Sequence, residues 1–523
     1  MAIGPTLGTG LFLAGGQALA VGGPASLLIS YTFLSLLVYF MATSAAEVAT
    51  YKPSRHGTIV THGFQYMDNS LGFATACVRW YTMAMFVPYE ITTAMVNIAL
   101  WNAGSNIAMW LILTTVLIVG LNFLPDRSFK SCETLFYRIK IGTLACLLVL
   151  SLSIALGGTT GHGHWGFRYW KKPGAMHEYL VRGPVGKFLG LLQCIHLSTT
   201  AFTFAPELIV QRAEQREVVG QPETPESFQP AAKSNIPRRV FGDVCQTVIP
   251  YILASLAMGV MAPYNNPLLT NSGAGAGISP FVIGINTARI RILPVTATLA
   301  IFLSSVTSAQ SYLYLASRSL YALADAGHAP TMFKNRNNWG VPWVAVSFTA
   351  TFTCLAFLSV AIPSSTMTTY FILSVNSSGY LSWVLSCLVY RRFRVQLHAN
   401  RITAAYRHAI QPVGTCVGFG FCIFLLLCNG LISAVSGNRN GPRVARIVMA
   451  YLSIPLFGIL YLIHRFGDTV PRAGPNQAGH IKETPRAPET RYCPRPRPIP
   501  HERSLQPPTS IELDQVWVMA REA

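Results

Sequence analysis

Charged residues are scarce in this sequence. Asp, Glu, Lys and Arg make up 11% of its 523 residues, whereas 51% are hydrophobic; a soluble globular domain carries about 25% charged residues. This composition excludes an ordinary soluble protein and indicates a chain that crosses a membrane many times. Acidic residues are the scarcest, with 20 Asp and Glu against 39 Lys and Arg, for a net charge of +19. Because the cytoplasmic loops of membrane proteins collect Lys and Arg, the excess does not indicate nucleic acid, and we expect no such partner.

Motifs for metal binding and catalysis are also missing. The 11 cysteines include no Cys-x-x-Cys pair, and Cys416, Cys422 and Cys428 are spaced so that they do not stack on one helix face. His162 and His164 are candidate ligands, but two ligands do not make a zinc site. No Ser/His or His/Asp cluster occurs at catalytic spacing, which argues against a membrane enzyme such as an acyltransferase. We therefore expect no metal, no cofactor and no catalytic residue.

Long apolar runs are abundant, and each approaches the roughly 20 residues that cross a bilayer as a helix. We predict an all-α polytopic membrane protein with about twelve transmembrane helices. The expected spans are 3–20, 26–49, 74–100, 106–124, 138–157, 188–210, 243–263, 293–316, 341–361, 367–390, 412–434 and 444–465. No basic segment precedes the first run, so we expect no cleavable signal peptide.

The distribution of basic residues predicts the orientation. Lys and Arg gather in the loops 49–73, 125–140, 211–242 and 391–411, while the alternate loops 101–105 and 362–366 contain none. This assigns the basic loops and both termini to the cytoplasm. Two loops do not fit the rule. The 158–187 loop is basic although it falls on the outer side, and the 435–443 loop contains Arg439 and Arg443.

A change of composition marks the domain boundary. Residues 1–466 form the predicted transmembrane domain, and from 467 to 523 the chain is rich in Pro and Arg with few large apolar residues. Such a tail cannot bury a core, so we expect it to be disordered. A proline-rich docking peptide is the alternative, and trafficking or ubiquitination machinery would be its partner in the cytoplasm.

The stretch from Gly4 to Phe12 opens the first apolar run, yet it contains three glycines and a proline. Gly costs about 1 kcal/mol and Pro about 3 kcal/mol relative to Ala inside a helix. An unwound stretch here would present backbone N–H groups that suit a carboxylate. A glycine-rich face for helix packing is the alternative interpretation.

Two glutamates in the predicted spans have different surroundings. Glu90 lies near the middle of the third span, and a carboxylate inside a membrane is expensive and usually marks an ion or proton pathway. Desolvation favours its neutral form, so we predict that Glu90 takes up and releases a proton; a protonated glutamic acid that only joins helices is the alternative. Glu47 lies beside Lys52 and Arg55 at the cytoplasmic end of its span, where we expect a structural ion pair.

A series of sequence blocks resembles the fungal amino acid permeases. The first block, Gly4 to Phe12, is similar to the Gly-Gly-Thr-Ile-Gly-Thr-Gly-Leu-Phe of that family. The others follow in order at 16–20, 47–53, 88–92, 166–174, 235–240, 263–267, 317–324, 339–343 and 378–383. The family belongs to the amino acid–polyamine–organocation superfamily. The resemblance implies its fold, an inverted repeat of two five-helix units with broken first and sixth helices, followed by two extra helices.

The resemblance also implies a binding site. In the family, the broken first helix holds the substrate carboxylate, which here corresponds to Thr6, Leu7, Gly8, Thr9 and Gly10. The broken sixth helix offers carbonyls to the substrate ammonium, and its family motif corresponds to the stretch from Phe202 to Leu208. Within this stretch we expect Phe204, Ala205 and Glu207 at the site, with Glu207 either ordering the break or assisting the proton path.

Two further parts of the site follow from the same resemblance. Ser374, Asn376 and Ser377 match a tenth-helix stretch that lines the side-chain pocket in relatives, with polar helix packing as the alternative. The family glutamate that matches Glu90 is tied to proton coupling or to cationic substrates, which agrees with the role inferred from its place in the membrane.

The resemblance thus implies a plasma-membrane, proton-coupled symporter of an L-amino acid. Two alternatives stay open, a non-transporting amino acid sensor and an inactive truncated permease. The second arises because relatives carry a long hydrophilic N-terminus and half of helix 1 before the first block, whereas this chain begins at Met1, and because Pro5 and the pair Ala205-Pro206 replace Gly and Gly-Thr of the family pattern.

Overall fold

The computed structural model describes residues 8, 10–51, 58–101, 106–157, 166–218, 235–270, 279–288, 293–401, 406–435 and 443–467. Within these ranges every regular element is a helix. The chain divides into two units, Met1–Pro471 and Arg472–Ala523. The second unit lies outside the described residues, and so does the predicted disorder of the tail.

The first two predicted spans form one long helical segment. A short π-helix, η1 (Gly10–Ala14), continues into α1 (Gly15–Tyr51), which is interrupted at Gly23, where φ is 81°. That left-handed conformation favours glycine, and Pro24 follows it, so the chain kinks there. The segment Gly10–Tyr51 has 42 residues. At 1.5 Å per residue it is about twice as long as one crossing requires, and the kink lies between the bounds of the two predicted spans.

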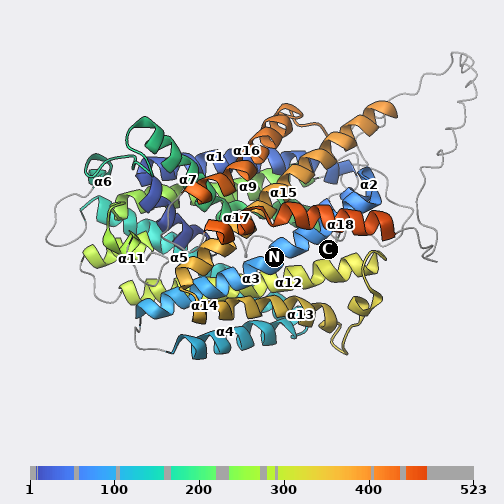
Figure 1. Cartoon of the computed structure of the whole chain (residues 1–523), viewed down its shortest axis with the longest axis horizontal. Coiled ribbons are helices and arrows are strands. Elements are labelled where there is room, and N and C mark those ends of the chain that lie inside the picture. Colours follow the sequence, from blue (N-terminus) through green and yellow to red (C-terminus); the bar gives the residue numbers. More distant parts are fainter. Residues whose placement is uncertain are drawn as a thin grey trace, which may run out of the picture. The chain divides into compact units, whose positions relative to one another are not determined.

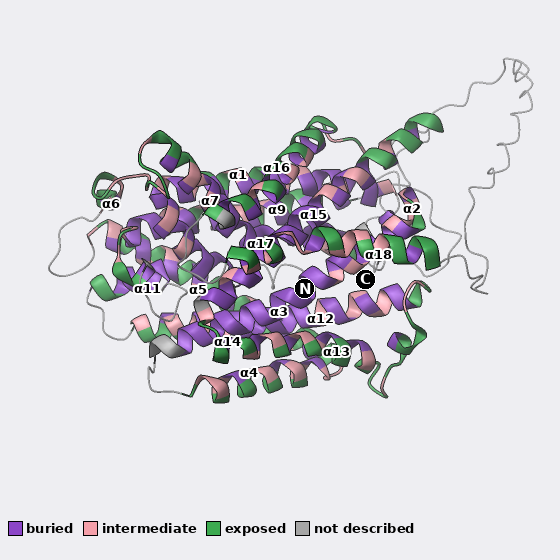
Figure 2. Cartoon of the chain, in the orientation of Figure 1, coloured by how far each residue is buried: buried purple, intermediate pink, exposed green. Residues whose placement is uncertain are grey.

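Helix α3 (Asn69–Trp101) lies at the centre of the helical unit, after the short helix α2 (Thr58–Tyr66). Its most extensive neighbour is α12 (Leu293–Asp325), which runs alongside it (Figure 1). Figure 2 shows α3 almost wholly in the colour of buried residues, whereas α4 is largely intermediate or exposed. A helix buried on all sides can hold polar residues such as Glu90 and Asn97, provided that its neighbours satisfy them.

Helices α4 (Ile107–Asn122) and α5 (Asp126–Ala155) correct one expectation from the sequence. The predicted cytoplasmic loop 125–140 is not a loop, because α5 begins at Asp126 and includes all four of its basic residues. Lys140 is buried inside the structure, with only 6% of it exposed. Arg127, Lys130 and Arg138 of this stretch are exposed, whereas Glu133 and Lys140 are buried. The charges lower the hydropathy of the stretch without preventing it from forming a helix.

The predicted sixth span contains a break. Helix α7 (Pro184–Phe202) ends and α8 (Ala205–Val218) begins with only Thr203 and Phe204 between them. The break falls inside the stretch that the sequence predicted. Before it lies the short helix α6 (Arg168–Lys171), and after it come α9 (Ile236–Met261), α10 (Pro267–Thr270) and α11 (Pro280–Thr287).

The remaining chain forms the last helices. They are η3 (Thr331–Lys334), α13 (Trp343–Ala350), η4 (Thr351–Phe357), α14 (Leu358–Ala361), α15 (Ser364–Ala399), α16 (Val413–Val435), α17 (Arg443–Tyr451) and α18 (Ser453–Gly467). Helices α17 and α18 meet at 45°.

Eight helical segments in the described residues are long and apolar enough to cross a membrane, or nine if the bent pair α17 and α18 is one span. Helix α4 is apolar but has only 16 residues, and α3 is less apolar because it carries Glu90, Asn97 and several threonines. Helix α4 has an exposed apolar face. The exposed side chains recur at helical spacing and are Met109, Ile112, Leu113, Val116 and Leu117. Such a face suits lipid. The number twelve and the inverted repeat stay predictions.

Candidate functional site

Gly8, near the start of the chain, packs directly against Glu90. A Cβ atom built on Gly8 would lie 2.5 Å from Glu90 Oε1 and 2.8 Å from Ser308 Oγ of α12. Only a residue without a side chain allows this approach. The structure therefore brings together two predicted site residues that stand 82 positions apart in the sequence. Thr6, Leu7 and Thr9 lie outside the described residues.

Gly10 makes a second close contact, with α7. A Cβ atom on Gly10 would lie 2.9 Å from the Cα atom of Ala201, one residue before the end of α7. Gly10, the last residue of the predicted carboxylate stretch, is thus in backbone contact with the end of α7, just before the break. A role of this stretch in holding the substrate carboxylate stays a prediction.

Lys140, Glu90 and Glu133 form a buried group of charged residues, the charged centre. The sequence interpretation missed the role of Lys140 in it. Its Nζ donates a hydrogen bond of 2.7 Å to Ser308 Oγ, the same hydroxyl that borders Gly8. Its ammonium also interacts electrostatically with Glu90 and with Glu133 of α5. Beside it lies a cavity of about 10 Å³, lined by Glu133 and Lys140 among others, which is room for about one water molecule. A buried cation with acidic partners is the arrangement that low dielectric surroundings require.

Aromatic rings connect Glu90 with the break. Phe204 lies with its ring centroid 5.5 Å from that of Phe86 and 5.7 Å from that of Tyr312. Phe86 and Tyr312 stack at 4.5 Å, and Tyr312 interacts electrostatically with Glu90. Phe86 is one helical turn before Glu90 on α3. The predicted residue Phe204 is therefore close to the charged centre, and Ala205 begins the helix that follows the break.

Glu207 has partners of its own. Arg79 Nε donates to Glu207 Oε2 at 2.7 Å, and both side chains are 5% exposed. Ser382 Oγ donates to the other carboxylate oxygen at 2.8 Å, and Arg79 also reaches Gln211 at 3.4 Å. These contacts join α3, α8 and α15 and support the expectation that Glu207 orders the break. Its predicted contact with substrate stays a prediction.

The three predicted residues of α15 each bond to a different helix. Ser374 Oγ and Tyr81 OH of α3 are 2.8 Å apart. Asn376 Nδ2 donates to the carbonyl of His196 on α7 at 2.6 Å, and the Ser377 hydroxyl meets that of Ser453. All three are buried. These contacts fit the alternative of polar helix packing, and a place in the side-chain pocket stays a prediction.

Comparison with known proteins gives the family. The family model described as amino acid permease matches residues 1–473. The chain belongs to the amino acid permease family. It is 34% identical over 465 residues to a probable proline-specific permease of Schizosaccharomyces pombe, covering 88% of this chain and 81% of that protein. It is also 34% identical over 477 residues to a proline-specific permease of Emericella nidulans, with 90% and 84% covered.

Solved structures support the fold of this permease. A manganese transporter of Eremococcus coleocola, solved with an aromatic bis-isothiourea substituted compound, has a TM-score of 0.55 over 89% of this chain and 93% of that chain. The identity is 13%, so the likeness concerns the fold alone. The permease is accordingly a multi-pass membrane protein built on a transporter fold.

Two contacts of the permease lie outside the predicted site. Trp383 Nε1 donates to the carbonyl of Thr203 at 2.9 Å, so one carbonyl of the break is already occupied. Trp383 lies in the block that resembles the family, but no pattern in the sequence pairs it with the break.

Glu47 is bound by Tyr390 OH and by the N–H of His408, each at 2.7 Å, with Arg394 at 3.5 Å.

The structural role expected for Glu47 is therefore confirmed with partners that the sequence did not suggest. Lys52 and Arg55, its neighbours along the chain, lie outside the described residues, as do His162 and His164.

Proposed function

We propose that this permease carries an L-amino acid together with a proton into the cell by alternating access. The contact between Gly8 and Glu90 is the observation that supports this most directly. If the substrate carboxylate binds the backbone at Gly8, it comes close to the carboxylate of Glu90. Two like charges about 4 Å apart repel by about 4 kcal/mol at an effective dielectric constant of about 20.

Protonation of Glu90 removes that repulsion. The substrate carboxylate and the proton then bind better together than separately, which is the thermodynamic condition for coupled transport. Lys140 supplies a counter-charge on the other side of Ser308. It interacts with both Glu90 and Glu133, so it keeps an acidic partner when Glu90 is protonated. The substrate ammonium is assigned to carbonyls near the break between α7 and α8.

L-Proline is the substrate to test first. The two relatives at 34% identity are named as proline-specific, and the rings of Phe86, Phe204 and Tyr312 pack together near Glu90. Flat aromatic faces suit the compact pyrrolidine ring of proline, which has no polar side-chain group to satisfy.

The proposed setting is the plasma membrane with both termini in the cytoplasm. The basic end of α15, with Arg391, Arg392 and Arg394, and the stretch after α8 then face the cytoplasm, in agreement with the positive-inside rule. Helix α6 lies at the opposite end of the helical unit from α2 (Figure 1), and it is assigned to the outer side.

Uptake of labelled L-proline into proteoliposomes under an inward proton gradient tests the proposal. The unmodified permease should accumulate proline above the external concentration. Glu90→Gln should lose gradient-driven accumulation while it retains proline exchange, because the neutral amide imitates the protonated acid permanently. Glu217→Gln is the matched control, since Glu217 pairs with Arg239 at the end of α8, away from Glu90.

The outcomes separate the alternatives. Equal gradient-driven accumulation by Glu90→Gln and the parent would remove Glu90 from coupling. Saturable binding of proline without any flux in the parent would instead favour the sensor.

A further inference from the structure

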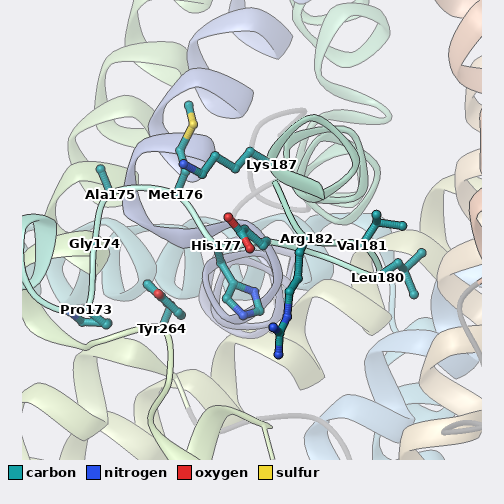
Figure 3. Close-up of a pocket in the computed structure, with 11 residues that line it drawn as sticks. Pro173, Gly174, Ala175, Met176, His177, Leu180, Val181, Arg182, Lys187 and Tyr264 are labelled. Carbon is teal, nitrogen blue, oxygen red and sulfur yellow. The ribbon is translucent and has the colours of Figure 1, made fainter. Parts of the chain in front are cut away.

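A second hollow lies apart from the site around Glu90. It has a volume of about 770 Å³ and is lined by residues between Pro173 and Lys187 together with Tyr264 (Figure 3). This is within the range of pockets that hold small ligands. Neither Gly8 nor Glu90 lines it. Most of its lining belongs to the 158–187 loop, one of the two basic loops that do not fit the positive-inside rule.

The walls of the hollow are tied to the kink in α1. The backbone N–H of His177 donates to the carbonyl of Gly22 at 3.0 Å, and His177 Nδ1 lies 3.0 Å from the carbonyl oxygen of Val21. The N–H of Ala25 donates to the carbonyl of Ala175 at 2.9 Å. The lining segment therefore spans the kink at Gly23 with bonds on both sides of it.

The same segment has a constrained backbone. Leu180 has a φ of 64°, a conformation that a branched residue rarely adopts and that the surrounding structure has to hold. Gly186 follows with no room for a side chain, because a Cβ atom would lie 1.7 Å from the carbonyl oxygen of Val181. A hollow held in this way is preformed, so a ligand that enters it loses little free energy to ordering the protein.

The hollow carries an excess of positive charge. Arg182 and Lys187 line it and are exposed, and neither forms an ion pair with any residue that the structure describes. In Figure 3 the side chains of His177 and Arg182 extend to the same side, and His177 lies 4.8 Å from the ring of Tyr264. Glu178 is the one carboxylate of the lining. The lining therefore offers cations that can attract a carboxylate and a carboxylate that can attract an ammonium, which are the two charged ends of a zwitterion.

We propose that this hollow is an outer capture site for amino acid zwitterions, in which Arg182 and Lys187 attract the carboxylate and Glu178 receives the ammonium. The inference rests on the proposed function, because it requires the 158–187 loop to face the medium that supplies substrate. Because a zwitterion has no net charge, the attraction acts at short range on each of its two ends, and salt weakens it because Arg182 and Lys187 are exposed.

The test compares the apparent KM for L-proline uptake at low and at physiological salt. Arg182→Gln/Lys187→Gln should raise KM at low salt about 3- to 10-fold and lose most of the salt dependence, with the maximal rate unchanged. Lys171→Gln/Lys172→Gln removes two charges from the same loop outside the hollow, and its KM should stay within about 2-fold of the parent. Arg182→Lys/Lys187→Arg keeps both charges and should behave like the parent.

Competition identifies the chemistry of the ligand. Millimolar propionate, a carboxylate without an ammonium, should raise the KM of the parent and have no such effect on the Gln/Gln variant. Inorganic phosphate that competes where propionate does not would overturn the carboxylate assignment. An equal rise of KM in Arg182→Gln/Lys187→Gln and in Lys171→Gln/Lys172→Gln would overturn the capture site. No change of KM in either variant would overturn it as well.

Failure of the proposed function gives a different result. If the parent takes up no amino acid, the transport proposal fails. Equilibrium binding of labelled L-proline to the purified parent and Gln/Gln variant at low salt then still decides about the hollow, since weaker binding by the variant supports it and equal binding overturns it.

Discussion

Removing the guanidinium of Arg79 should destabilise the permease far more than removing that of Arg318. Arg79 and Glu207 are 2.7 Å apart with 5% of each side chain exposed. A buried pair that loses one partner leaves an uncompensated charge, at a cost of about 3–5 kcal/mol. Arg318 and Asp126 are 2.9 Å apart, but 19% and 50% of these side chains are exposed. Because half of the Asp126 side chain is exposed, this pair is screened by solvent and contributes only about 0–1 kcal/mol.

Arg79→Met and Arg318→Met are therefore matched substitutions that differ in burial. The assay is equilibrium unfolding of the purified permease by SDS in mixed micelles, followed by tryptophan fluorescence. The equilibrium constant of the Arg79 variant should fall on the order of 10²–10⁴-fold, and that of the Arg318 variant about 5-fold or less. The double variant Arg79→Met/Glu207→Met should recover much of the loss, because it buries no lone charge.

Equal losses in the two arginine variants would show that burial does not govern this pair. A double variant whose loss equals the sum of its single losses would show that Arg79 and Glu207 do not interact energetically.

Two more predictions concern the centre around Glu90. Gly8→Ala should weaken proline binding more than 10-fold, because its Cβ would lie 2.5 Å from Glu90 Oε1, whereas Gly142→Ala, with nothing within 4 Å of the added atom, should bind normally in the same equilibrium dialysis. Lys140→Met should reduce proton-driven uptake on the order of 100-fold at matched protein levels, because it leaves Glu90 without its nearby cation; uptake within 3-fold of the parent would contradict that role.

The sequence was informative where a residue is unusual for its surroundings. Glu90 is conspicuous because a carboxylate in an apolar span is costly, and the glycines from Gly4 to Gly10 because helices disfavour them. Both features are local, so a pattern along the chain reveals them. The break at Thr203 and Phe204 came from a family motif, since nothing in the apolar content of residues 188–210 marks it.

The residues that interact with Glu207 and Glu90 could not be found from local patterns in the sequence. Arg79 and Lys140 are basic residues whose meaning depends on which helix faces them. A count of charges along the chain placed Lys140 in a cytoplasmic loop, although its ammonium lies 2.7 Å from Ser308, 168 residues away. Opposite charges on separate helices come together only through the packing of α12 against α3 and α5 and through the contact of Arg79 with α8. One sequence contains no record of that packing.

The positions of these pairs along α3 constrain how the permease can move. Arg79 and Glu90 are about three helical turns apart, and they lie on nearly the same face of the helix. Arg79 is tied to α8 by a buried ion pair, and Glu90 faces Lys140 of α5 and the backbone at Gly8. Separation of α8 from α3 would leave two buried charges alone, at a cost of several kcal/mol. Withdrawal of the Gly8 stretch from a protonated Glu90 separates no ion pair, so the first helix can open the site at a smaller cost than the helix after the break.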